Sequence, residues 1–252
     1  MPFLVRMKEL PWRVLAVEFV VVVLGILGAL GVDSWWEGVQ ERKVENRYLL
    51  RLSGDLRLSR DSLIAEIAAH RQSADSTRLV LNELRSGPNP GGAELLRTAI
   101  GLATYLTVWF PFHTTYEELV STGNLALITN DTLREALGSY DRLVKDNADW
   151  DDFGEKWYLA SIEPVLSKKL VYSDVLPGGI ERRDIPGSRF EEDFSSLYED
   201  RLLWNALVMK LDLEEGVLEA RERVLQAMDI ALELTQEELA ARGLSSGGLP
   251  AS

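Results

Sequence analysis

The segment VLAVEFVVVVLGILGALGV, from Val14 to Val32, decides the fold of this chain. It contains one charged residue, Glu18. A helix rises about 1.5 Å per residue, so this segment reaches roughly 28 Å, close to the thickness of the hydrocarbon core of a bilayer. Its apolar side chains cover every face of such a helix, which is typical of a helix surrounded by lipid. The segment therefore predicts a transmembrane helix over residues 14–32.

The flanking residues predict how this helix crosses the membrane. Trp12 precedes it and Trp35 and Trp36 follow it, and indole rings favour the headgroup level at both ends of a span, where they form an interface belt. Residues 1–13 contain more basic than acidic side chains, whereas the whole chain of 252 residues carries a net charge of −13. The positive-inside rule then places residues 1–13 in the cytoplasm and the remainder across the membrane.

A cleaved signal peptide is the alternative to a retained anchor. Ala29-Leu30-Gly31 has small residues at the spacing that a signal peptidase recognises, and the basic start of the chain fits as well. Against this alternative, the apolar segment is longer than the apolar region of an ordinary signal peptide, and it contains Glu18. We therefore favour an anchor that stays attached to the protein.

Glu18 allows three interpretations. A carboxylate near the centre of a bilayer costs about 2.5–3.5 kcal/mol on insertion scales. Glu18 can lie close enough to the cytoplasmic headgroups to be hydrated or paired with Arg13, it can contact a partner helix, or it can take part in ion conduction. Gly25, Gly28, Ala29 and Gly31 form a small-residue surface, which lets helix backbones approach closely. Together with Glu18, this surface predicts contact with a second copy or another membrane protein.

Composition limits what the rest of the chain can do. Roughly 200 residues follow the anchor, enough for one ordinary domain. The chain has no cysteine, which excludes disulfides, thiolate metal sites and cysteine nucleophiles, and its two histidines disfavour a histidine-rich metal site. Its acidity argues against nucleic acid as a partner. The sequence contains no phosphate-binding loop, metal motif or catalytic triad, so we expect no enzymatic activity, metal or cofactor.

Apolar residues at helical spacing continue to the end of the chain. They predict one long helix continuous with the anchor, three later helical segments and breaks at glycine and proline. The expected segments are 34–84, 93–109, a helix that begins at Asn130 or Asp131 and continues over 147–171, and 192–242. The segment over 147–171 is expected to be anchored in the core by Trp150, Phe153, Trp157, Ile162, Val165 and Leu166. The first and last helices match in length, so we expect them to pair antiparallel.

Two polar stretches contain residues that could form a site. Near residue 115, Thr115 and Glu118 stand at capping-box spacing and predict a short helix that ends at Gly123. The neighbouring residues His113, Tyr116 and Glu117 could form an acid–base cluster, but no nucleophile stands beside them, and helix caps explain them. The acidic residues Asp149, Asp151, Asp152 and Glu155 lack the loop spacing of an EF-hand, so we interpret them as a solvated helix surface instead of a calcium site.

Two sequence blocks together carry a resemblance. The first runs from Glu18 through the anchor to Val32-Asp33-Ser34-Trp35-Trp36-Glu37 and Glu41-Arg42; the second is Tyr116-Glu117-Glu118-Leu119-Val120-Ser121-Thr122-Gly123-Asn124-Leu125-Ala126-Leu127-Ile128, followed by Asn130, Leu133-Arg134 and Tyr140. In this order they resemble a bacterial family of single-pass membrane proteins whose domain has no assigned function. The resemblance implies an N-terminal anchor in the inner membrane and a helical periplasmic domain. It implies no catalytic or ligand-binding residue.

The expected fold is therefore all-α, with one N-terminal transmembrane helix that continues into an extracytoplasmic antiparallel helical bundle. The bundle is expected over 33–243, and 244–252 is expected to be a disordered tail. The first functional hypothesis is a membrane-anchored interaction or structural protein, such as an accessory subunit of a larger membrane complex. The alternative is a periplasmic sensor or ligand-binding module that signals through a partner, because residues 1–13 are too few for an output domain.

Overall fold

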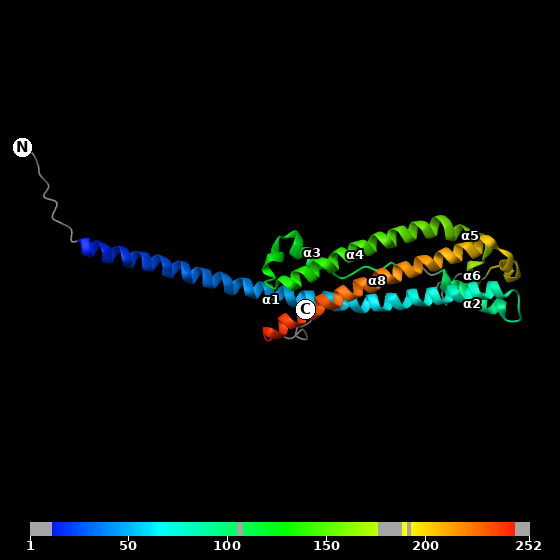
Figure 1. Ribbon diagram of the computed structural model, residues 1–252, viewed down its shortest axis with the longest axis horizontal. Helices are drawn as coiled ribbons and strands as arrows, with labels where there is room; N and C mark the ends of the chain where they lie inside the picture. The colour runs from blue at the N-terminus through cyan, green and yellow to red at the C-terminus, as the bar shows by residue number, and fades with distance from the viewer. Residues whose placement is uncertain (1–11, 105–107, 176–187, 191–192, 245–252) are drawn as a thin grey trace, which may run out of the picture. The chain divides into compact units, whose positions relative to one another are not determined.

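The computed structural model describes residues 12–104, 108–175, 188–190 and 193–244. These residues form helices and no strand, which confirms the all-α prediction for the described part of the chain. The chain divides into two compact units, residues 1–48 and 49–252. The longest helix, α1 (Trp12–Ser86), contributes to both units, as the expected single long helix requires. Figure 1 shows the helices in chain order.

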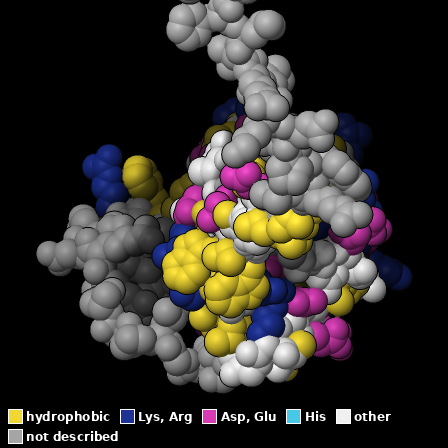
Figure 2. All heavy atoms as spheres, turned by 90° about the vertical axis from the view of Figure 1, so that its left-hand side faces the viewer, with side chains coloured by type: hydrophobic (Ala, Val, Ile, Leu, Met, Phe, Trp, Pro, Cys, Tyr) yellow, Lys and Arg dark blue, Asp and Glu magenta, His cyan; other side chains and the backbone are white. Residues whose placement is uncertain are grey.

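Helix α1 is apolar and exposed over most of residues 16–36. It is the one helix in the described ranges that is long and apolar enough to cross a membrane, with a mean hydropathy of 2.2 over its most apolar stretch and none of that stretch buried. Large aliphatic and aromatic side chains between Val17 and Trp36 lie at the surface. Exposed hydrophobic side chains are visible beside acidic and basic ones in Figure 2.

The second unit is built on three long helices: residues 49–86 of α1, α4 (Asp131–Trp157) and α8 (Arg201–Ala241). Figure 1 shows α4 and α8 side by side, and they are in contact. Each helix buries residues at alternating steps of three and four, the spacing of a coiled-coil seam, with one step of seven on α1 between Leu63 and His70. The buried seam residues are Leu49, Leu52, Leu56, Ser59, Leu63, His70, Ser73, Thr77, Val80 and Leu84 on α1; Leu133, Leu137, Tyr140, Val144, Asn147, Asp151 and Gly154 on α4; and Leu203, Leu207, Lys210, Glu214, Val217, Arg221, Val224 and Met228 on α8.

Three ion pairs link the outer edges of α1 and α8. Arg60 pairs with Asp229 at 2.6 Å, Arg71 with Glu222 at 2.6 Å, and Arg78 with Glu215 at 2.7 Å. Residue numbers rise along α1 while they fall along α8. All six side chains are well exposed, so each pair adds less than about 1 kcal/mol to stability.

The second predicted helix is shorter than expected. Helix α2 (Gly92–Ala103) ends before residue 109, and residues 108–113 are not helical and are bonded to α1. The buried hydroxyl of Ser59 accepts from the N–H of Phe112 at 2.8 Å and donates to its carbonyl at 2.9 Å. The indole N–H of Trp109 donates to the hydroxyl of Ser62 at 3.0 Å. The two bonds to Ser59 satisfy the backbone N–H and carbonyl of Phe112, which have no helical partner.

The predicted short helix is present as α3 (Thr114–Ser121), but its capping box is not. The N-cap residue is His113, and its side chain makes no capping bond. Instead, the carboxylate of Asp55 on α1 accepts from the N–H of Thr115 at 3.0 Å, and Glu118 pairs with an arginine of α1. The predicted end is confirmed, because Gly123 has a positive φ of 73°.

After α3, a short 3-10 turn, η1 (Asn124–Leu127), leads to α4. Asn130, one of the two predicted caps, accepts from the N–H of Leu133 at 3.1 Å. The expected helical continuation is present, with a π-helical turn, η2 (Tyr158–Ile162), between α4 and α5 (Glu163–Lys169). The turn stands just before Pro164, which has no N–H to donate to the preceding turn.

Two expectations within α4 are wrong. Trp150 and Phe153 were expected in the core, yet 41% and 56% of their surfaces are exposed. Asp151 was expected on a solvated surface, yet it is buried. The buried seam passes through Asn147, Asp151 and Gly154, so the two aromatic rings fall on the neighbouring, outward side of the helix.

The chain closes with α6 (Tyr172–Val175), η3 (Phe194–Glu199) and α8. Helix α8 begins at Arg201, later than the predicted start at residue 192, because the carboxylate of Asp200 caps the N–H groups of Leu202 and Leu203 at 2.9 and 3.0 Å. Gly243, with a φ of 68°, ends it as predicted. Most of the interval between the predicted segments 147–171 and 192–242, and the predicted tail from residue 245, lie outside the described residues.

Candidate functional site

The residues predicted to contact another membrane helix all lie on α1. Glu18, Gly25, Gly28 and Ala29 are exposed, and a Cβ atom added to either glycine would meet no atom of the described structure within 4 Å. The interface-belt residues Trp35 and Trp36 are also exposed, with ring centroids 6.4 Å apart. The side chain of Trp12 lies outside the described part of the structure. The contact and interface roles of these residues stay predictions.

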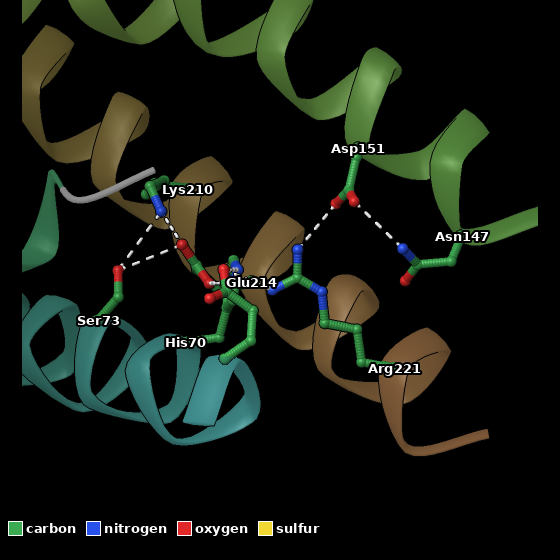
Figure 3. Close-up of polar contacts among 8 residues, drawn as sticks. His70, Ser73, Asn147, Asp151, Lys210, Glu214 and Arg221 are labelled. Atoms are coloured by element: carbon green, nitrogen blue, oxygen red, sulfur yellow. Dashed lines mark hydrogen bonds and ion pairs between the residues drawn. The ribbon is translucent and has the colours of Figure 1, made fainter. Parts of the chain in front are cut away.

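The structure brings together a second set of polar residues that was not predicted. We call it the polar layer, and it lies among the three long helices of the second unit (Figure 3). Its members are Glu66, His70 and Ser73 from α1, Asn147 and Asp151 from α4, and Lys210, Glu214 and Arg221 from α8.

Lys210 and Glu214 form one end of the polar layer. They lie one turn apart on α8, their side chains are 1% and 2% exposed, and the ammonium of Lys210 contacts Oε1 of Glu214. Ser73 donates its hydroxyl to the same carboxylate oxygen at 3.2 Å and accepts from Lys210 at 3.4 Å. Burial lowers the pKa of Lys210 to about 7, because removal from water disfavours the charged ammonium.

His70 connects Glu214 to Glu66. Its Nδ1 contacts Oε2 of Glu214, and its Nε2 lies 3.7 Å from Oε1 of Glu66. Burial, and next the positive charge of Arg221, lower the pKa of His70 to about 4. The imidazole is therefore neutral at pH 7, and its Nδ1–H donates to Glu214.

Arg221 forms the other end of the polar layer. Its guanidinium is fully buried and donates to Asp151 at 3.1 Å and to Glu66 at 3.3 Å. Asn147 donates to the second oxygen of Asp151 at 3.1 Å. Burial raises the pKa of Asp151, and Arg221 opposes that shift. Two buried atoms of this end, Nε of Arg221 and Oδ1 of Asn147, have no hydrogen-bond partner among the described residues.

The chemistry available to the polar layer follows from its charges. With His70 neutral, the two basic side chains Lys210 and Arg221 face three carboxyl groups, and the hydroxyl of Ser73 and the amide of Asn147 donate to these groups. Within the described ranges, no group of three or more histidine, cysteine or acidic residues could hold a metal ion. Buried, mutually paired charges at seam positions are one means by which helical bundles specify the alignment of their helices.

The acid–base candidates His113, Tyr116 and Glu117 lie around the start of α3. Nε2 of His113 lies 3.5 Å from Glu117 and 3.9 Å from Asp141, an aspartate of α4. Tyr116 is buried, and burial raises its pKa. Glu117 is well exposed and His113 is partly exposed, so the contact between them lies near the surface.

A search against known proteins adds no relative: no family model, no curated protein and no solved structure matches this chain. The resemblance of the two sequence blocks to a membrane-protein family therefore stays a prediction.

The contribution of the Lys210–Glu214 pair can be measured in the full chain in detergent. Lys210→Met leaves the Glu214 carboxylate buried without its ammonium partner, so we expect the free energy of unfolding to fall by about 3 kcal/mol. The double variant Lys210→Met/Glu214→Gln removes both charges and should recover most of this loss. Urea unfolding followed by circular dichroism gives both values.

Lys145→Met is the matched control, because Lys145 forms an exposed pair with Asp141 on α4. It should cost less than about 1 kcal/mol. A Lys210→Met variant that is no less stable than Lys145→Met would contradict a paired, buried ammonium.

Stability should also depend on pH through His70. Its pKa is about 4 in the folded protein and 6.5 when unperturbed. Between these values the unfolded chain binds a proton that the folded protein does not, so the stabilisation is complete above pH 6.5 and is lost as the pH falls toward 4. His70→Gln keeps a hydrogen-bond donor but does not titrate, so the wild-type protein should lose more stability than this variant over that window. Equal losses in urea unfolding at both ends of the window would refute the shift.

Proposed function

We propose that this chain is a membrane-anchored helical interaction or structural protein, and that it serves as an accessory subunit of a larger bacterial membrane complex. Residues 14–32 span the inner membrane, residues 1–13 lie in the cytoplasm, and the bundle lies in the periplasm. The observation that carries the proposal is the exposure of the apolar part of α1. Apolar surface in water costs about 25 cal/mol per Å², so these side chains require lipid or another protein around them.

The order of the ion pairs between α1 and α8 supports an antiparallel bundle. The pairs of Arg60, Arg71 and Arg78 with successively lower residue numbers of α8 are what neighbouring helices of opposite direction produce. In such a bundle the chain runs in one direction along α1 and in the opposite direction along α8.

One face of the anchor supports docking to another membrane helix. Seven residues separate Glu18 from Gly25 and four separate Gly25 from Ala29, so the three lie on one face of a helix, with Gly28 beside them. Small residues let a second helix approach, and a carboxylate in or near hydrocarbon favours a polar partner. We propose this face as the contact with a second copy or with another membrane protein.

Membership of the resembled family is part of the proposal. The first block lies on α1, and the second covers most of α3, all of η1 and the beginning of α4. The second block contains the positive-φ Gly123 and the cap Asn130, residues whose type is required by the local backbone. The second block thus corresponds to one continuous structural segment, from α3 through η1 to the beginning of α4.

The orientation can be tested with single cysteines, because the natural chain has none. Ser121 is exposed on α3, so in intact bacterial cells with a permeabilised outer membrane Ser121→Cys should react with a membrane-impermeant maleimide. Met7→Cys, in the basic N-terminal segment, should react only after the inner membrane is broken. The reverse pattern, or release of the chain by alkaline carbonate, would contradict the proposal.

The docking face can be tested by placing a leucine on this face and, as a control, a leucine on another side of the anchor. Gly25→Leu adds bulk on the face that contains Glu18 and should dissociate the detergent-purified assembly, as measured by light scattering after gel filtration. Glu18→Gln should weaken it by removing the charge.

Ala16→Leu is the matched control. Ala16 is nine residues before Gly25 and lies about half a turn away from it around the helix, so added bulk there should leave the assembly intact. An unchanged mass for Gly25→Leu, or an equal loss for Ala16→Leu, would reject this face.

A further inference from the structure

An open groove runs along the outer side of α4 and α8. Trp150 and Phe153 divide it into two hollows of about 590 and 500 Å³. The two rings pack edge to face with centroids 6.2 Å apart. The Trp150 ring lies against α8 at Gly216, where an added Cβ atom would be 3.6 Å from it.

The groove has the helical spacing of a second seam beside the buried one. Its lining residues recur at steps of three and four on both helices: Leu143, Asp146, Trp150, Phe153 and Trp157 on α4, and Met209, Asp212, Gly216, Glu219 and Arg223 on α8. Two such rows on neighbouring helices form the receiving surface for a further helix, with large side chains as ridges and Gly216 as a gap.

The charges around the groove select one sign of partner. Its acidic lining residues are Asp146, Asp149, Asp212, Glu215 and Glu219, and among the described residues that line these hollows Arg223 is the one basic side chain. Glu215 is engaged by Arg78, whereas Asp212 and Glu219 flank Gly216 one turn to either side. A negatively charged groove favours a positively charged partner.

Asn147 gives a second, independent indication. Its side chain is 2% exposed and lines the larger hollow, and its Oδ1 accepts no hydrogen bond from the described residues. Its amide nitrogen is already used by Asp151. A buried acceptor without a donor is costly, so the occupant of the groove should bring a hydrogen-bond donor.

We infer that this groove binds a basic amphipathic helix of a partner protein. The apolar side of that helix covers Trp150 and Phe153, its lysine or arginine side chains meet the acidic residues of α8, and one donor reaches Asn147. A second copy of the chain is disfavoured, because both copies carry a net charge of −13. The inference rests on the proposed interaction role and assigns it a surface on the bundle, separate from the anchor.

The test uses the full chain in nanodiscs of zwitterionic lipid and a synthetic, labelled leucine–lysine helical peptide about five turns long. Fluorescence anisotropy should show binding, and a leucine–glutamate peptide of the same pattern should not bind. Trp150→Ala and Phe153→Ala should each raise the Kd by about tenfold or more, as loss of a buried aromatic anchor does. Leu79→Ala, which shortens an exposed apolar residue of α1, should leave the Kd unchanged.

The acidic contribution has its own matched pair. Asp212→Asn/Glu219→Gln should weaken binding several-fold and reduce its dependence on salt, because it removes two charges from the groove. Glu233→Gln/Glu237→Gln removes the same charge from exposed positions near the other end of α8 and should have little effect.

Three results would overturn the inference. The first is equal binding of the basic peptide to the wild type and to Trp150→Ala, and the second is equal binding of the two peptides. The third is self-association that Phe153→Ala abolishes while the basic peptide fails to bind, which would assign the groove to a second copy. Nanodiscs without protein measure uptake by lipid. If the peptide fails to bind while Gly25→Leu still dissociates the assembly, the groove proposal falls and the docking face of the anchor stands; the opposite pair of results rejects the anchor face alone.

Discussion

The structure of the second unit depends on one constraint: charges placed on the buried seams of three helices must meet their partners. An unpaired charge inside a protein costs several kcal/mol, whereas a shift of one helix past another costs little among aliphatic side chains alone. Arg221 reaches Asp151 on α4 and Glu66 on α1, so it ties α8 to both neighbours at once. The polar layer therefore permits only an alignment in which these groups meet, while the leucines above and below it supply most of the hydrophobic stabilisation.

The two units follow opposite rules for burial. In the first, α1 exposes valine, leucine and tryptophan side chains along its length. In the second, the same helix buries His70 and Ser73. Exposed apolar side chains are unfavourable in water, and so are charges buried in a helical bundle. We propose that lipid surrounds the exposed apolar side chains of α1. The buried charges are stabilised by pairing with one another within the chain.

The sequence predicts the helices well where local spacing determines them, and less well where distant residues do. The long first helix, the asparagine cap of α4 and the glycines that end α3 and α8 follow from local patterns, and all are present. The early end of α2 and the cap of α3 depend instead on Ser59 and Asp55 of α1, which lie more than 50 residues away in the chain. No local pattern contains that information, because the competing partner is supplied only by the folded bundle.

The polar layer was not predicted for a different reason. The helical spacing of its residues indicates core positions, but their charge suggests that they lie at the surface. Lys210, Glu214 and Arg221 continue the three- and four-residue steps of Leu203, Leu207, Val217 and Val224, so spacing alone assigns them to the core. Hydrophobicity alone predicts that these three charged residues lie at the surface and that Trp150 and Phe153 are buried. Both predictions are wrong, on α8 and α4 respectively. Positions where spacing and hydrophobicity disagree are the ones at which a sequence departs from simple folding rules, and such departures concentrate where specificity or binding is required. In this bundle the inward departures select the alignment of the helices, and the outward ones mark the groove for which we propose a basic partner.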